Sequence, residues 1–188
     1  MTTSEPTVKP TVLIIEDSYN QFQIIRELLK NNYNILPIAT SLDDFNVIYA
    51  KLRKFLNSDS NDFPSEFNNY SEVSAFIVDY ELIVDNIDIT GVYFCEKTES
   101  IWNGKIPVLF LTILSEFDKS NNINKIKDRN KNIRYDYFRK PDYWGDKRVG
   151  INKTVSKSTE FKNDMKTKID ALISRSSCGI PKIFLDKI

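Results

Sequence analysis

The sequence contains no histidine in 188 residues. This absence excludes catalysis by an imidazole and metal sites built on histidine within this chain. Cysteine is also scarce, since the two residues of this type, Cys95 and Cys178, provide neither a disulfide framework nor the spacing of a metal site. So few cysteines favour a reducing compartment, and we expect a cytoplasmic protein.

Long apolar runs are missing as well. No stretch approaches the length of a membrane span, and we expect neither a signal peptide nor a transmembrane segment. Apolar residues nevertheless make up 41% of the chain, which favours a globular protein over a disordered one. The length fits one domain with a sizeable core.

The chain has no net charge, but its charges are unevenly distributed. Residues 1–100 carry 16 acids and 7 bases, whereas residues 101–188 carry 10 acids and 19 bases. The basic half includes 119–140, with 8 bases against Asp128 and Asp136. This stretch is either a solvated helix and loop or a surface for an acidic protein partner. A nucleic-acid partner is the less favoured alternative, because no DNA-binding motif accompanies the charge.

Short apolar runs alternate with segments of helical periodicity. The central run is 73–79, VSAFIVD, whose β-branched and aromatic residues are typical of a strand buried on both faces of a parallel sheet. The other predicted strands are 11–16, 35–39, 107–111 and 133–138, and the predicted helices are 19–31, 41–55, 90–102, 115–130 and 160–174. This alternation predicts an α/β fold, with one doubly wound, five-stranded parallel sheet and helices on both faces.

The segments outside this pattern set the expected domain limits. Residues 1–10 are expected to form a flexible tail, 11–175 one domain, and 176–188 a C-terminal tail that closes the core or meets a partner. Three polar stretches within the domain are predicted to be inserted loops, namely 57–71, 80–89 and 142–157.

Polar groups stand at the ends of four of the five predicted strands. Glu16 and Asp17 follow the first run, Asp79 ends the central run, and Thr112 and Lys140 follow two others. In an open α/β sheet ligands bind at the carboxyl ends of the strands, so we expect these groups to meet. Carboxylates suit Mg²⁺, and one can accept a phosphoryl group, whose oxygens a lysine and a hydroxyl would then hold.

The order of four motifs, LIIED, FIVD, VLFLT and FRKP, resembles the receiver domain of two-component response regulators over roughly residues 10–175. The resemblance implies a flavodoxin-like sheet with the strand order 2-1-3-4-5. It also implies Mg²⁺-dependent phosphorylation of Asp79, with the phosphoryl group donated by a histidine of a partner protein. That partner would be a histidine kinase or a phosphotransfer protein.

The resemblance assigns further roles residue by residue. Glu16 and Asp17 match the acidic pair that holds Mg²⁺ together with Asp79, and Glu81 stands where receivers offer a backbone carbonyl to the metal. Each acid could also be a strand-end, capping or exposed carboxylate. Glu16 and Asp17, for example, would suit the positive end of the following helix.

Three further positions match the family. Thr112 matches the hydroxyl that moves toward the phosphoryl group, Lys140 the lysine of a Lys-Pro pair whose peptide bond is often cis, and Tyr137 the aromatic switch. A strand-end threonine, a lysine in a basic segment and a tyrosine at the sheet edge are the alternative interpretations.

Ile113 departs from the family, which usually has a small residue there. We expect this branched side chain to slow phosphorylation, hydrolysis or both.

The leading hypothesis from the matching motifs is a phosphoryl-accepting receiver domain that acts through protein contacts or a homodimer rather than as an enzyme. The alternatives are a receiver-like scaffold that binds partners without phosphorylation and, ranked last, a Mg²⁺-dependent phosphatase.

Overall fold

The computed structural model describes residues 9–58, 64, 73–84, 87–102, 107–113, 134–145 and 150–177. The described elements follow in the order β1 (Thr11–Ile15), α1 (Tyr19–Leu29), β2 (Asn34–Leu36), α2 (Leu42–Asn57), β3 (Val73–Asp79), β4 (Glu81–Val84), β5 (Ile87–Thr90), α3 (Gly91–Trp102), β6 (Val108–Thr112), β7 (Tyr135–Arg139), the 3-10 helix η3 (Asp142–Gly145), α5 (Ile151–Lys157) and α6 (Thr159–Ser177). None of the helices in these ranges is long and apolar enough to cross a membrane.

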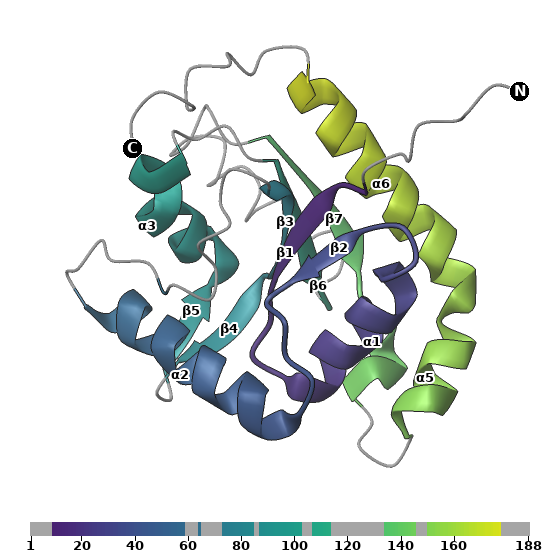
Figure 1. The fold of residues 1–188 in the computed structure, drawn as a ribbon, viewed down its shortest axis with the longest axis horizontal. Coiled ribbons are helices and arrows are strands. Elements are labelled where there is room, and N and C mark those ends of the chain that lie inside the picture. Colours follow the sequence, from purple (N-terminus) through teal and green to yellow (C-terminus); the bar gives the residue numbers. More distant parts are fainter. Residues whose placement is uncertain are drawn as a thin grey trace, which may run out of the picture.

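Five strands form one sheet in the order β2-β1-β3-β6-β7, and every pairing is parallel (Figure 1). Counted along the chain without the β4–β5 hairpin, this is the flavodoxin-like order 2-1-3-4-5. The predicted fold class is therefore confirmed. The central strand begins and ends at the predicted residues, Val73 and Asp79.

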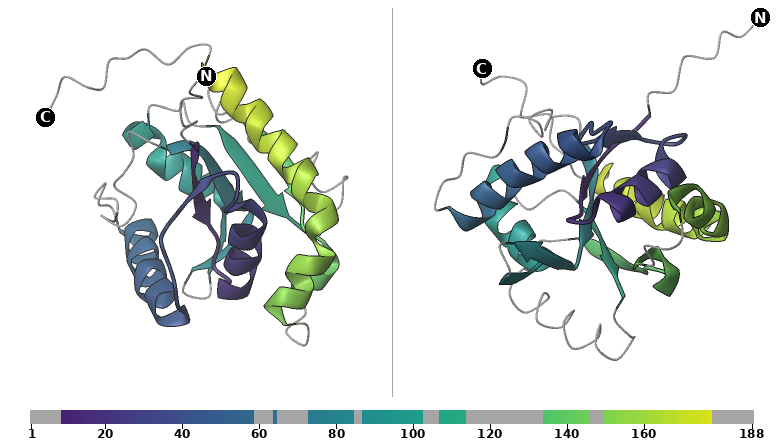
Figure 2. Two further views of the ribbon diagram at one scale, coloured as in Figure 1. Left: turned by 45° about the vertical axis from the view of Figure 1, so that its right-hand side comes forward. Right: turned by 90° about the horizontal axis from the view of Figure 1, so that it is seen from below.

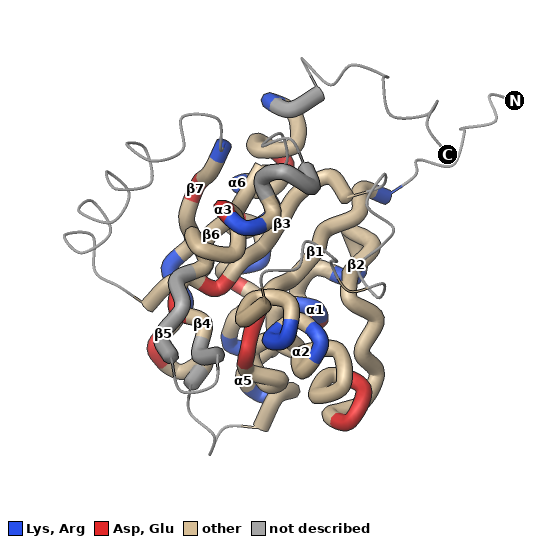
Figure 3. The backbone as a smooth tube through the Cα atoms, turned by 90° about the vertical axis from the view of Figure 1, so that its left-hand side faces the viewer, with Lys and Arg blue, Asp and Glu red and all other residues tan. Residues whose placement is uncertain are grey.

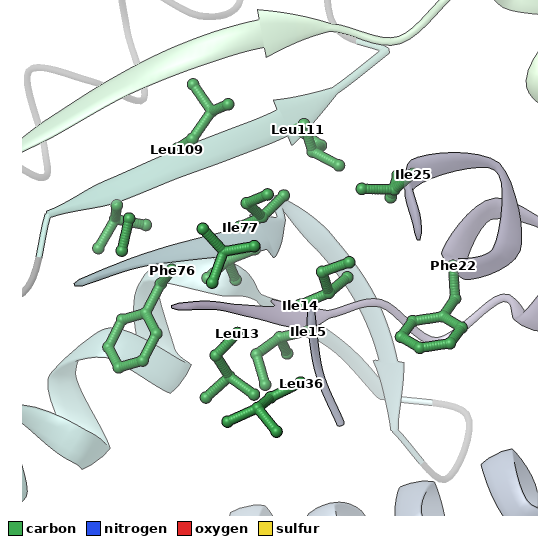
Figure 4. Packing of buried hydrophobic residues seen from close by; sticks show 14 of the residues in the cluster. Leu13, Ile14, Ile15, Phe22, Ile25, Leu36, Phe76, Ile77, Leu109 and Leu111 are labelled. Carbon is green, nitrogen blue, oxygen red and sulfur yellow. The ribbon is translucent and has the colours of Figure 1, made fainter. Parts of the chain in front are cut away.

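Helices cover both faces of the sheet, as predicted (Figure 2). The helices α1, α5 and α6 lie on one face, and α2 and α3 lie on the other. Every residue of β1 is buried, so its alternating side chains fill both layers of the core. Figure 4 shows Ile14 on the side of Ile25 from α1, and Leu13 and Ile15 on the opposite side. Each such fully buried side chain contributes about 1.5–3 kcal/mol to folding.

Helix α2 begins with a capping box. The Ser41 hydroxyl accepts a hydrogen bond from the backbone N–H of Asp44 at 3.1 Å, and the Asp44 carboxylate accepts one from the N–H of Ser41 at the same distance. The helix then packs on the first turn of α1, since the Phe45 ring lies 5.4 Å from the ring of Tyr19. At its other end, the Tyr93 hydroxyl of α3 donates to the Leu56 carbonyl at 3.3 Å.

The prediction of a loop over 80–89 is wrong. This stretch forms an antiparallel hairpin of β4 and β5, with Glu81 opposite Thr90 and Val84 opposite Ile87. The apolar, β-branched residues on either side of Asp85 and Asn86 favour two short strands over an open loop. The hairpin lies outside the five-stranded sheet, at the end of the sheet along which α2 also lies (Figure 1).

The prediction of a polar loop over 142–157 is also wrong. Instead η3 and α5 occupy this stretch, and α5 packs on α1. A buried contact between η3 and the residue that follows α5 explains this difference. The indole of Trp144 is 3% exposed and donates a hydrogen bond from Nε1 to the hydroxyl of Ser158, which is fully buried, at 2.7 Å. The ring of Trp144 also packs against Phe138 of β7.

Several expectations fall on residues outside the described ranges. These are most of the N-terminal tail, most of the loop at 57–71, the helix at 115–130, the basic stretch up to residue 133 and the tail from 178 onward. The peptide bond between Lys140 and Pro141, which is often cis in the receivers that the chain resembles, is not cis here. Among the described residues the cis bond lies between Leu36 and Pro37.

Candidate functional site

Three charged side chains from separate strands meet at the carboxyl edge of the sheet. Glu16 directly follows β1, Asp79 ends β3, and Lys140 directly follows β7. The ammonium of Lys140 lies 2.6 Å from Oδ2 of Asp79 and 3.0 Å from Oε2 of Glu16. All three residues are buried, with exposed fractions of 3% for Lys140, 2% for Glu16 and 5% for Asp79. The structure thus brings together three of the residues that the sequence predicted to meet.

Burial sets the protonation of this cluster. Loss of solvent raises the pKa of Glu16 well above its usual value and also raises the pKa of Asp79, while Lys140 opposes both shifts. Burial alone would lower the pKa of Lys140, but the two carboxylates outweigh it and leave that pKa raised. The lysine is therefore firmly charged, and it is the group that compensates the buried acids.

Asp17 completes an acidic cluster. One carboxylate oxygen from each of Glu16, Asp17 and Asp79 lies within 4.8 Å of the others. Oε1 of Glu16 accepts a hydrogen bond from the backbone N–H of Ser18 at 3.1 Å while Oε2 contacts Lys140, so both oxygens of that carboxylate are held. Three carboxylates at this spacing fit a hard divalent cation such as Mg²⁺, which binds oxygen ligands.

The backbone of Glu81 faces the same cluster. Its N–H donates to Oδ1 of Asp79 at 3.2 Å, so both oxygens of the Asp79 carboxylate are held. The N–H of Gly91 donates to the carbonyl of Tyr80 at 2.8 Å, and hydrogen-bonded pairs alternate along an antiparallel ladder. The Glu81–Thr90 pair is therefore a non-bonded pair, and the Glu81 carbonyl points away from Thr90. This geometry fits the predicted metal-ligating carbonyl.

Gly91, the first residue of α3, packs directly on the backbone of Asp79. A Cβ at this position would lie 2.4 Å from the Asp79 carbonyl oxygen and 2.8 Å from Cγ1 of Val78. Only glycine allows the helix to start this close to the strand. The sequence analysis missed Gly91, although its place at the start of the predicted helix after Asp79 was an available signal.

Thr112 ends β6, which lies between β3 and β7. Its side chain is buried, and its carbonyl accepts a hydrogen bond from the backbone N–H of Lys140 at 2.8 Å, which fixes the start of the lysine side chain. The next residue, Ile113, is 55% exposed. It therefore points toward solvent beside the end of β6.

Tyr137 lies in β7 on the edge of the sheet and is half-buried. The ammonium of Lys168 from α6 lies 5.6 Å from the centre of the Tyr137 ring. The same lysine contacts Asp136 at 3.3 Å. The predicted switch residue is thus in contact with α6, whereas its proposed movement remains a prediction.

The sequence analysis also missed two residues of α2, Tyr49 and Arg53. The Tyr49 ring stacks on Phe45 with a centroid distance of 5.8 Å, and the Arg53 guanidinium lies 5.1 Å from the centre of the Tyr49 ring. The signal was present, because residues four apart share a helix face. Burial raises the pKa of the Tyr49 phenol, and the charges of Asp17 and Glu16 raise it further.

No protein-family model and no curated protein matches the chain. Several solved structures are nevertheless similar to it in fold. The receiver domain of a modulated diguanylate cyclase from Desulfovibrio desulfuricans G20 is 16% identical, and the match covers 91% of this chain and 98% of that one, with a TM-score of 0.48. The chemotaxis protein CheY4 of Vibrio cholerae is 14% identical over 81% of this chain and 98% of its own, with a TM-score of 0.43.

A third similar structure is the receiver domain of an HD domain-containing protein from Pseudomonas fluorescens Pf-5. It is 12% identical over 89% of this chain and 99% of its own, with a TM-score of 0.41. At these identities and TM-scores the likeness concerns the fold alone. The fold of this chain is established by its own strand order, which is the flavodoxin-like order expected of a receiver domain.

Proposed function

We propose that this protein is a phosphoryl-accepting receiver domain, and that Asp79 is the acceptor. The observation that carries the proposal is the contact of 2.6 Å between Lys140 and Asp79 inside a buried acidic cluster. An ion pair alone could be structural. Here the carboxylate also stands at the carboxyl end of the central strand, between strands that supply the other acids and the hydroxyl of Thr112.

The reaction is a phosphoryl transfer from a phosphohistidine of a partner protein. An oxygen of Asp79 attacks the phosphorus in line, and a P–O bond forms while the P–N bond breaks. The electron pair of the broken bond stays on the imidazole, which takes up a proton. Asp79 becomes an acyl phosphate and gains negative charge, so a cation close to the new oxygens stabilises the product.

The surrounding residues have distinct tasks in this proposal. Lys140 already contacts Asp79 and would pair with an oxygen of the phosphoryl group. The Thr112 hydroxyl would donate to a second oxygen. Glu16, Asp17, Asp79 and the Glu81 carbonyl would hold Mg²⁺, which when bound neutralises charge on the transferred group.

The phosphohistidine that donates the phosphoryl group must belong to a partner protein, because this chain has no histidine of its own. A histidine kinase or a phosphotransfer protein would donate the phosphoryl group, and its action would be confined to the cytoplasm where we expect this chain. Phosphorylation would then bias a surface that includes Tyr137 and act through protein contact or a homodimer. The chain would turn over no separate substrate, and only its own phosphorylation and dephosphorylation would be catalysed.

Mass spectrometry tests the proposal directly. The wild type is incubated with Mg²⁺ and a small donor such as phosphoramidate, and the expected result is an adduct of one phosphoryl group. Asp79→Asn is nearly isosteric but cannot accept the group, and it should remain unlabelled with an unchanged circular dichroism spectrum. Hydroxylamine should remove the adduct, as it does any acyl phosphate. Full labelling of Asp79→Asn would show that another residue is the acceptor.

The alternative is a receiver-like scaffold that binds partners without phosphorylation. The exposed Ile113 next to Thr112 favours it, because a stiff, branched side chain at this position would hinder a donor that approaches Asp79 from this side. The absence of an adduct under the same conditions, with Mg²⁺ binding intact, would support the scaffold.

A further inference from the structure

Exposed apolar side chains gather at the start of helix α2. Five large apolar side chains of the described residues are exposed, and three of them, Ile38, Leu42 and Val47, lie just before α2 or in its first half. Val47 is 58% exposed although it belongs to a helix whose other face is buried in the core. Exposed apolar groups that lie close together indicate a contact surface, whereas single ones are ordinary.

Four residues form a line along the outer face of α2. Asp43, Val47, Ala50 and Lys54 are spaced by four, three and four residues, the intervals at which side chains lie next to one another on one side of a helix. All four are exposed. The inner side of the helix is formed by the buried residues Phe45, Ile48, Tyr49, Leu52, Phe55 and Leu56. We call the four outer residues the α2 seam.

The α2 seam has opposite charges at its two ends and apolar residues between them. Asp43 lies in the first turn of the helix and Lys54 in the last turn. Figure 3 shows the same division along α2, with the acidic positions at its start in red and the basic positions in its second half in blue. The seam is therefore complementary to a second copy of itself that runs in the opposite direction.

The charges also select the direction of such a pair. In an antiparallel pair of α2 helices, each Asp43 faces a Lys54 of the other copy, and each Val47 faces an Ala50. In a parallel pair, Asp43 would face Asp43 and Lys54 would face Lys54, and both of these like-charge contacts repel. Only the antiparallel arrangement satisfies both the apolar and the charged positions of the seam.

We propose that the α2 seam binds a second copy of this chain, with a two-fold axis that passes between Val47 and Ala50. Such a contact is isologous, because the same surface supplies both of its halves. The small side chain of Ala50 lets the two helices approach closely, and Val47 of the other copy packs against it. One pair of helices makes a small contact, below roughly 1,200 Å² in total, so the dimer is weak and dissociates on dilution.

This inference goes beyond the proposed function, because the α2 seam contains none of the residues proposed for phosphoryl transfer. Sedimentation velocity of the unphosphorylated wild type, from low to high micromolar concentration, tests it without a phosphoryl donor. We expect a shift from monomer to dimer that is weaker at high salt, since salt screens exposed ion pairs. A wild type that remains monomeric at low salt over the whole range would overturn the inference, whether or not Asp79 accepts a phosphoryl group.

Charge reversal tests the pairing of Asp43 with Lys54. Asp43→Lys and Lys54→Asp each replace both ion pairs of the dimer by like-charge contacts, so each variant alone should dimerise about tenfold more weakly than the wild type. An equimolar mixture of the two variants should recover the dimer, because each new charge then faces its opposite. The double variant Asp43→Lys/Lys54→Asp should recover it as well. Failure of both to recover the dimer would overturn the antiparallel arrangement.

Asp164→Lys is the matched control for charge, because Asp164 is an exposed acid of α6, on the other face of the sheet. It changes the net charge as Asp43→Lys does and should leave the dimer unchanged.

Val47→Lys tests the apolar centre of the seam. It places two like charges beside the two-fold axis and should abolish the dimer, whereas α2 itself should still form, because lysine favours a helix more than valine does. Circular dichroism verifies that each variant is folded. Dimerisation of Val47→Lys and Asp43→Lys as strong as that of the wild type would show that another surface forms the dimer, and the inference would be wrong.

Discussion

Gly91 and Asp79 are in direct backbone contact, with no room for a side chain between them. A Cβ on residue 91 would lie 2.4 Å from the Asp79 carbonyl oxygen, much closer than a carbon and an oxygen can approach. The N–H of Gly91 also donates to the Tyr80 carbonyl at 2.8 Å. The start of α3 therefore fixes the backbone of the proposed acceptor, while Lys140 and the N–H of Glu81 hold its carboxylate.

The first prediction concerns this contact. Gly91→Ala forces the backbone of β3 or α3 to move, so we expect a loss of about 1–3 kcal/mol in the free energy of unfolding. Phosphorylation of Asp79 should slow as well, because its carboxylate shifts away from Lys140. Urea unfolding and labelling kinetics measure the two effects.

Gly150→Ala is the control for this experiment, since nothing lies within 4 Å of a Cβ at that position. It should change stability by less than about 0.5 kcal/mol. A Gly91→Ala variant as stable as Gly150→Ala would mean that the close approach relaxes without cost.

The second prediction concerns Lys140. Lys140→Met removes the ammonium and leaves the buried carboxylates of Glu16 and Asp79 facing each other without a cation. Breaking a buried ion pair in this way costs about 3–5 kcal/mol. Mg²⁺ should restore more stability to Lys140→Met than to the wild type, because a cation held by the same acids replaces the lost charge.

Thermal unfolding with and without Mg²⁺ measures this difference, and Lys30→Met serves as a control because Lys30 pairs with Glu27 at an exposed position. Equal Mg²⁺ effects in Lys140→Met and the wild type would argue against a metal site at these carboxylates.

The third prediction concerns the contact between α6 and Tyr33, which lies between α1 and β2. The Tyr33 hydroxyl donates to Oδ1 of Asp170 at 2.6 Å, and Lys166 also pairs with Asp170. Partial burial would raise the pKa of Asp170, but the bonds from Lys166 and Tyr33 outweigh it and lower that pKa. Because the folded pKa lies below the unfolded one, this contact stabilises the protein above the unfolded pKa and is lost as the pH falls through the folded pKa.

Tyr33→Phe removes the hydroxyl alone, so it should cost about 1 kcal/mol at neutral pH and less in acid. Urea unfolding at both pH values measures the difference. Ser174→Ala, which removes an exposed hydroxyl bonded within α6, should show no such pH dependence. A cost of Tyr33→Phe that stays constant with pH would mean that the bond to Asp170 contributes nothing to the titration.

The sequence predicts those parts of the site that strand ends determine. Glu16, Asp17, Asp79 and Lys140 each follow or end an apolar run, and parallel strands place their carboxyl ends at one edge whatever the details of packing. This is why the central strand over 73–79 and the contact of Lys140 with two acids could be expected from the pattern alone.

The parts that depend on long-range packing could not be predicted. Strands of four residues, such as β4 and β5, are too short for periodicity to distinguish them from a loop. The helix α5 has seven residues, and its position depends on the burial of Trp144 against Ser158, which no local pattern shows.

The last prediction concerns Ile113. This side chain follows Thr112 at the edge where the donor must enter, and it is 55% exposed, so it does not belong to the core. Isoleucine is branched at Cβ and cannot easily turn aside. It should therefore obstruct both the phosphoryl donor and the water that hydrolyses the acyl phosphate.

Ile113→Ala should accordingly speed phosphorylation by phosphoramidate and also speed loss of the phosphoryl group, with stability changed by less than about 0.5 kcal/mol, as for most exposed substitutions. Both rates are followed at equal Mg²⁺ in the variant, the wild type and the control Ile38→Ala, whose side chain is 75% exposed beyond the edge strand β2. In-line attack is sensitive to small displacements, so even partial obstruction should be visible in the rates. If neither rate rises in Ile113→Ala, the donor and the water reach Asp79 from another side, and the β4–β5 hairpin then becomes the boundary of the entrance to examine next.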